Sequence, residues 1–130
     1  MGQQQLLLIA YGVIVVGIAV VVGITLFSTL AAESNRDQLF SDLNFISAIA
    51  RAHFKKPVNM GEGENSFANF KIPTALLETA NGTLEHTQTG HNSDHIHFRA
   101  TGKELGKDGI NPIIIEVRIT ISENKFNVKN

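Results

Sequence analysis

No Asp, Glu, Lys or Arg occurs between Met1 and Ala32, and the run from Leu6 to Phe27 is almost wholly aliphatic. An α-helix rises about 1.5 Å per residue, so roughly 22 residues form a helix about 33 Å long. This length is enough to cross the hydrocarbon core of a bilayer, which is about 30 Å thick. Lipid or other protein chains must cover such a helix. We predict that residues 1–32 form a hydrophobic helix in a membrane or in the core of an assembly.

A secretory signal peptide is the first alternative for this segment. Such a peptide carries Lys or Arg ahead of an apolar region of about 7 to 15 residues. Here the first basic residue is Arg36, and the apolar run is longer than that region. We therefore expect the segment to belong to the working protein.

The helical period continues beyond the charge-free segment. Apolar residues recur at intervals of four, three, four and four positions, at Leu39, Leu43, Ile46, Ala50 and Phe54. This spacing puts them on one face of a helix. Pro57 cannot continue a helix and disfavours helical angles at Lys56, so residues 33–56 are predicted to be an amphipathic continuation. A helix from about Gln3 to Lys56 would be on the order of 80 Å long.

The remaining residues, 57–130, are predicted to be a loop followed by a small antiparallel sheet. Apolar and polar residues alternate most clearly at 113–121 and at 96–101, as in half-buried strands. Thr83–Thr89 and Lys125–Val128 are weaker strand candidates, and Thr74–Ala80 is either a short helix after Pro73 or an irregular lead-in. The connections are short, at 81–82, 90–94, 102–109 and 123–124. They favour a meander of about four strands.

The fold class expected from these elements is α+β, with a long N-terminal helix packed on the sheet. The helix stripe and the alternating strands each leave an apolar face that needs cover. We therefore expect these faces to pack on each other. The predicted packing residues are Leu43, Ile46, Ala50 and Phe54 on the helix and Ile96, Phe98, Ile115, Val117 and Ile119 on the strands.

This layout resembles that of the type IV pilins. The resemblance covers nearly the whole chain and includes the residues Met1-Gly2-Gln3-Gln4-Gln5 that lead into the apolar run. It implies a subunit that waits in the cytoplasmic membrane and is then assembled by pilus-type machinery into an extracellular homopolymer on the cell surface. In such a filament the apolar helices bundle in the core and the sheets lie outside. The residues expected in the core are Gln5, Leu6, Leu8, Ile9, Gly12, Val16, Gly17, Val20, Gly23, Ile24 and Phe27.

The N-terminus departs from the usual pilin pattern. Pilins carry a basic leader that ends in glycine, and a glutamate a few residues into the mature chain. That position holds Gln5 if Met1 is the mature start, or Leu7 if cleavage follows Gly2. An amide accepts a hydrogen bond from a neighbour's amine less strongly than a carboxylate does. We expect a divergent pilin-like protein that assembles without that ion pair, unless a leader precedes this sequence.

Histidines are the candidates for site chemistry. His86, His91, His95 and His97 fall close together. If a hairpin turns at Gly90–Ser93, His86 lies opposite His97 with His95 beside it, and neutral imidazoles in that arrangement could hold zinc or copper. The alternative is a set of polar residues on a strand face. No obligatory metal and no cofactor are predicted, and His53 is expected to be a packing residue.

Other function classes find little support in the sequence. There is no cysteine for a disulfide or thiolate site, and the net charge of −1 gives no basic footprint for nucleic acid. No serine, lysine or carboxylate pair stands beside a base in a catalytic pattern, so no enzyme is predicted. Three classes remain: a filament subunit, which is favoured; a single-pass anchored domain acting as an extracytoplasmic binding module; and a His-rich metal-binding membrane protein.

Overall fold

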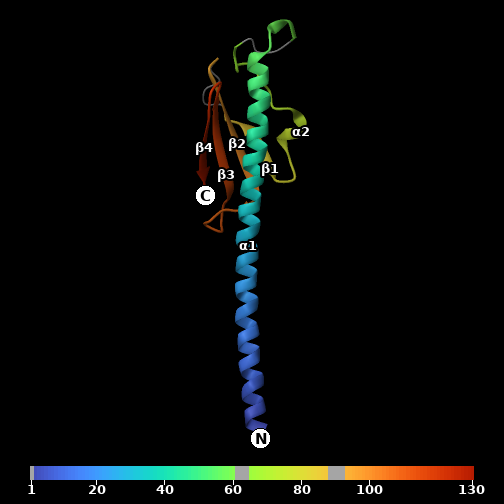
Figure 1. Cartoon of the computed structure of the whole chain (residues 1–130), viewed down its shortest axis with the longest axis vertical. Helices are drawn as coiled ribbons and strands as arrows, with labels where there is room; N and C mark the ends of the chain where they lie inside the picture. Colours follow the sequence, from blue (N-terminus) through green and yellow to red (C-terminus); the bar gives the residue numbers. More distant parts are fainter. Residues whose placement is uncertain (1, 61–64, 88–92) are drawn as a thin grey trace.

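The computed structural model describes residues 2–60, 65–87 and 93–130. Helix α1 runs from Gly2 to Lys55, 54 residues without interruption, and its upper half carries the rest of the described chain (Figure 1). It ends just ahead of Pro57, as the restriction imposed by that proline predicts. The basic residues His53 and Lys55 lie in the last turn. Positive charge at the C-terminal end of a helix interacts favourably with the helix dipole.

The strands form one antiparallel meander. After α1 come a 3₁₀ turn at Val58–Met60 and a short helix α2 at Thr74–Leu77, and then strands β1 Gly82–His86, β2 His95–Leu105, β3 Pro112–Thr120 and β4 Asn124–Lys129. The strand order is β1-β2-β3-β4, and every neighbouring pair is antiparallel. The predicted α+β class, with a long helix packed on a four-stranded sheet, is confirmed.

Strand β2 is longer than its alternating pattern predicts, because it continues through a glycine. The connection was expected to begin at Gly102, yet β2 ends at Leu105 with a register shift between Thr101 and Leu105. A Cβ at Gly102 would collide with the side-chain oxygen of Asn35, so only glycine lets the strand lie this close to α1. The turn that joins β2 to β3 is therefore shorter than predicted.

The start of β1 differs from prediction in a similar way. Asn81-Gly82 was expected to be a turn, but Gly82 pairs with Gly102 inside the sheet. A Cβ at Gly82 would collide with the carbonyl oxygen of Thr101, which again explains the glycine. The described part of this strand ends at His86 rather than Thr89. Most of the expected turn at 90–94 lies outside the described residues.

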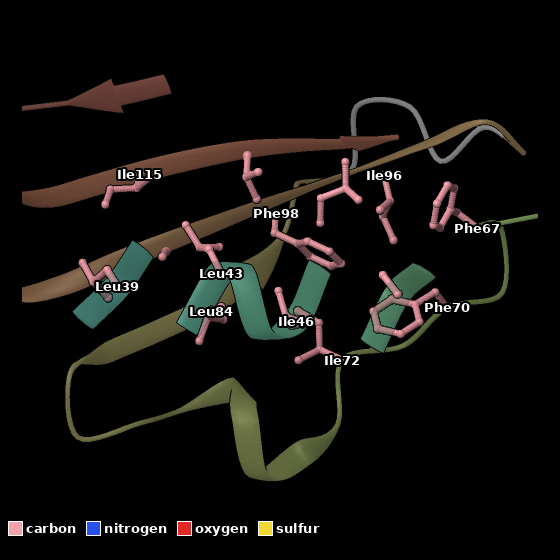
Figure 2. Packing of buried hydrophobic residues seen from close by; sticks show 14 of the residues in the cluster. Leu39, Leu43, Ile46, Phe67, Phe70, Ile72, Leu84, Ile96, Phe98 and Ile115 are labelled. Carbon is pink, nitrogen blue, oxygen red and sulfur yellow. The ribbon is translucent and has the colours of Figure 1, made fainter. Parts of the chain in front are cut away.

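The core lies between one face of α1 and the inner face of the sheet (Figure 2). All the predicted packing residues except Phe54 are buried there, and Phe54 packs at the edge of this cluster, with its ring 4.6 Å from that of Phe67. Burial of large apolar side chains stabilises such a fold by about 1.5–3 kcal/mol each. The cluster also contains side chains that the packing prediction left out: Leu39, Phe67, Phe70, Ile72, Leu84, Ala100 and Ile113.

Polar contacts attach the sheet to α1 at both ends of the buried stripe. Near the lower end, the Asn35 side-chain amide donates to the Asn81 carbonyl oxygen at 2.8 Å. Near the upper end, the Arg51 guanidinium donates to the Thr120 carbonyl oxygen at 3.1 Å and to the side-chain oxygen of Asn124 at 2.6 Å. The helix and the sheet therefore form one body from Asn35 to Arg51. We refer to residues 65–87 and 93–130 as the head.

Candidate assembly surface

The apolar half of α1 has no cover within the chain. Every residue from Gly2 to Leu30 is exposed, and the helix extends well beyond the lower end of the head (Figure 1). Phe27, for example, is 77% exposed. The most apolar window of α1 has a mean hydropathy of 2.9 and none of it is buried. By length and composition α1 can cross a membrane, a criterion that signal sequences also meet.

All the residues predicted for a filament core lie in this uncovered half, from Gln5 to Phe27. With 3.6 residues per turn, they fall on one half of the helix circumference. A Cβ added at Gly12, Gly17 or Gly23 would meet no atom of the described chain within 4 Å. These glycines are therefore open notches in the surface, where a neighbouring helix can approach closely.

Polar side chains near the end of the apolar half are satisfied within the helix. The hydroxyls of Thr25 and Thr29 donate to the carbonyl oxygens of Val21 and Thr25, both at 3.0 Å. The Ser28 hydroxyl donates to the Thr25 carbonyl oxygen at 2.9 Å. Because these hydroxyls have partners on their own helix, lipid or another apolar helix can cover them at little cost.

An uncharged stripe continues along α1 on the side away from the sheet. From Ile9 onward, intervals of three, four and seven keep residues on one helical face through Val16, Val20, Gly23 and Phe27. The same spacing continues beside the head through the exposed residues Ser34, Gln38, Ser41, Phe45, Ala48 and Ala52. We call this second set the back stripe. The back stripe was not predicted from the sequence, although its repeating interval is visible there.

A groove lies where the lower end of the head meets α1. It has a cavity volume of about 690 Å³ and is lined by Ser28, Thr29 and Ala32 on the helix, by Leu105 at the end of β2, and by Gly106 and Lys107 on the connection from β2 to β3. This connection therefore lies level with the last residues of the apolar half. Its placement at that level was not predicted from the sequence.

The expected histidine arrangement is wrong. His86 pairs with Phe98 rather than with His97, and its ring lies on the core side, 4.9 Å from the Phe98 ring and 6.1 Å from the Phe70 ring. His95 and His97 alternate with the buried Ile96 and so lie on the outer face of the sheet, with their rings 5.3 Å apart. The cause is the strand register, which puts His86 on the same side as the buried Leu84.

No group of three or more His, Cys, Asp or Glu side chains suited to a metal occurs among the described residues. His91 lies outside them. His53 packs with its ring 5.4 Å from that of Phe70, which agrees with the packing role expected for it. The structure therefore puts His86 on the opposite face of the sheet from His95 and His97.

On the outer face of the sheet, the carboxylate of Glu116 lies among basic groups. It accepts from Lys129 Nζ at 3.0 Å and from the Arg99 guanidinium at 2.8 Å. The hydrogen bonds from Lys129 and Arg99 hold the pKa of Glu116 below its ordinary value. This cluster joins β2, β3 and β4, and we assign it a structural role.

In comparisons with protein-family models, with curated proteins and with solved structures, nothing matched the chain. A function is therefore inferred from the chain's own surfaces.

Proposed function

We propose that this chain is the structural subunit of a type IV pilus-like filament, in which the apolar halves of α1 bundle in the core and the heads lie outside. The observation that carries the proposal is the helix itself. It is unbroken from Gly2 to Lys55. The head packs against it from Asn35 onward, and its residues from Gly2 to Leu30 are exposed. A subunit that polymerises through its helix needs this combination.

The uninterrupted helix between the two halves of α1 favours a polymer over a module tethered by a flexible linker. An anchor needs only about 20 apolar residues followed by a flexible linker. Here α1 continues without a break across 27–35, the stretch between the apolar run and the first buried residue. The head is therefore held in one orientation to the rod. A fixed orientation is required if each subunit is to repeat the same contacts along a filament.

The back stripe supplies a surface for a neighbouring helix beside the head. It is uncharged, and its small residues Ser34, Ser41, Ala48 and Ala52 allow a close approach. Phe45, which is 57% exposed, is its largest apolar side chain. With the sheet on one side of α1 and the stripe on the other, bundled helices leave the heads on the outside.

The same surfaces define the partners and the location in this proposal. Before assembly, lipid of the cytoplasmic membrane covers the apolar half; after assembly, copies of the same chain cover it in a filament on the cell surface. Pilus-type machinery would move the subunit from one environment to the other. Gln5 then stands at the N-terminal end of the bundle and contributes an amide rather than a carboxylate.

Electron microscopy of material sheared from cells that express the chain tests the proposal. We expect thin helical filaments that an antibody to the head decorates along their length. If the chain instead remains entirely in the membrane fraction as a monomer, the filament role is refuted. A single-pass anchored binding module would then be the better description of the same helix.

A further inference from the structure

The end of β2 and the connection from β2 to β3 present apolar side chains at the lower end of the head. Ile110 is 79% exposed and Leu105 is 49% exposed. Ile121, in the β3–β4 turn at the opposite end, is 44% exposed. Single exposed apolar residues are common on soluble proteins. What distinguishes Ile110 and Leu105 is their level along α1.

The β2–β3 turn, Gly106–Asn111, lies beside the end of the apolar half. Its residues Gly106, Lys107 and Gly109 share the groove with Ser28 and Thr29 of α1. If Leu6–Phe27 fills a hydrocarbon core about 30 Å thick, the next few residues lie in the headgroup layer, because the whole bilayer is about 40–45 Å thick. The β2–β3 turn then lies in that layer as well.

The backbone of this turn is organised by its own hydrogen bonds. Gly106 N donates to Asn111 O at 2.7 Å and Gly109 N donates to Gly106 O at 3.0 Å, with Gly109 at a φ of 67°. The Asp108 carboxylate accepts from the backbone N–H groups of Ile110 and Asn111, both at 3.1 Å, and from the Asn111 side chain at 2.7 Å. The exposed Ile110 is therefore presented on a preformed turn rather than on an unrestrained loop.

The charges around the turn suit a lipid interface. Lys103 and Lys107 flank Leu105, and long lysine side chains can keep their ammonium groups in water while their methylenes lie along apolar surface. Glu104 and Asp108 balance these charges, so no net positive charge is available to select anionic lipid. A bilayer of neutral phosphatidylcholine should therefore be sufficient.

We propose that the β2–β3 turn docks on the bilayer surface next to the membrane-embedded helix, with Ile110 and Leu105 in the headgroup layer. The turn contacts lipid, and this contact holds the head against the membrane before assembly. The inference rests on the membrane stage of the proposed function and not on the filament stage.

The absence of cysteine from the chain permits a direct test by site-specific labelling. The full chain is reconstituted at a low protein-to-lipid ratio in phosphatidylcholine vesicles that carry nitroxide lipids. A small fluorophore is attached in separate variants: Val16→Cys in the helix, Lys107→Cys in the β2–β3 turn, which leaves Ile110 in place, and Ile121→Cys in the far turn. Arg51 contacts the strand ends next to that far turn, so the label at 121 lies roughly 35 Å further along α1 than Ser28.

We expect a nitroxide near the headgroup to quench the label at 107 about twofold or more, because interfacial side chains lie about 5–10 Å into the headgroup boundary. The label at 121 should be quenched little. A nitroxide near the bilayer centre should quench the label at 16, which reports on the span alone. If 16 is quenched but 107 behaves like 121, docking is overturned while the span stands; if 16 is not quenched, the membrane stage fails and docking fails with it.

A second measurement asks whether Ile110 causes the contact. With the label on Lys107→Cys, the added substitution Ile110→Asp should abolish headgroup quenching, whereas the matched substitution Ile121→Asp should leave it unchanged. Quenching that survives Ile110→Asp overturns the role of Ile110. A label at 107 that is protected from soluble quenchers only in assembled filaments identifies a second copy as the occupant and overturns the lipid assignment.

Discussion

The two halves of α1 share one continuous backbone but differ in how their side chains are covered. Beside the head, Leu39, Leu43 and Ile46 are buried under the sheet. Below the head, every residue through Leu30 is exposed, although these residues are more apolar. Helix formation alone therefore does not bury a helix: the head buries one face of the amphipathic half, whereas nothing in the described chain covers the apolar half.

The largest effect is expected from a charge in the uncovered half. Val16→Asp should abolish filaments while the head stays folded, because a carboxylate buried without a partner among apolar helices costs several kcal/mol per subunit. Electron microscopy of sheared material measures assembly, and circular dichroism of the detergent-solubilised chain measures the head. Ile121→Asp puts the same carboxylate in an exposed turn and should leave filaments intact. Normal filaments from Val16→Asp would refute a core role for this half.

Shortening a buried side chain in the covered half should instead destabilise the head. Leu43→Ala or Ile46→Ala should lower the free energy of unfolding of the head by roughly 2 to 5 kcal/mol, as for other large-to-small core changes. Denaturant unfolding of the full chain in detergent provides the measurement. Phe45→Ala on the back stripe is the matched comparison: it should change head stability little but weaken assembly. A large loss of stability at Phe45 would show that both faces of this half serve the head.

The periodic parts of the molecule were predictable from the sequence. Spacing of three and four residues identified α1, and alternation identified β2 and β3, because each pattern reports which side chains need cover. The side of the sheet occupied by His86 depended on register, which the weak pattern of β1 did not specify. The pairing of Gly82 with Gly102 was also missed, because glycines are more common in turns than at close backbone contacts.

Other features that the sequence did not predict lie in segments without a regular period. Phe67, Phe70 and Ile72 belong to a stretch without strand or helix, yet all three lie in the core (Figure 2). Their apolar character in a polar connection was the available signal. The groove beside Ser28 depends on how far β2 extends down the helix, which no local pattern states. Contacts set by long-range geometry were thus the least predictable part of the candidate site.

A smaller effect is expected from acid, and it should act on the stability of the head. Because the pKa of Glu116 is lowered in the folded head, its contribution is present above its unfolded pKa and is lost as the pH falls through the folded value. Head stability should therefore decline below about pH 4.5. The change should be about 1 kcal/mol or less, because the pairs with Arg99 and Lys129 are partly exposed. Glu116→Gln should flatten the pH dependence of denaturant unfolding in this range; an unchanged slope would contradict the assignment.

The smallest effect is expected from removing metal. The structure puts His86 on the core side of the sheet and His95 and His97 on the outer side, so these side chains do not converge on one ion. Where a metal is structural, its binding free energy is part of the folding free energy, and its removal collapses the site. Filaments soaked in a strong chelator should therefore keep their diameter in electron micrographs, and the head should keep its melting temperature. If they dissociate instead, and the double substitution His95→Ala with His97→Ala has the same effect, a metal shared between the outer faces of neighbouring subunits would replace helix packing as the source of cohesion.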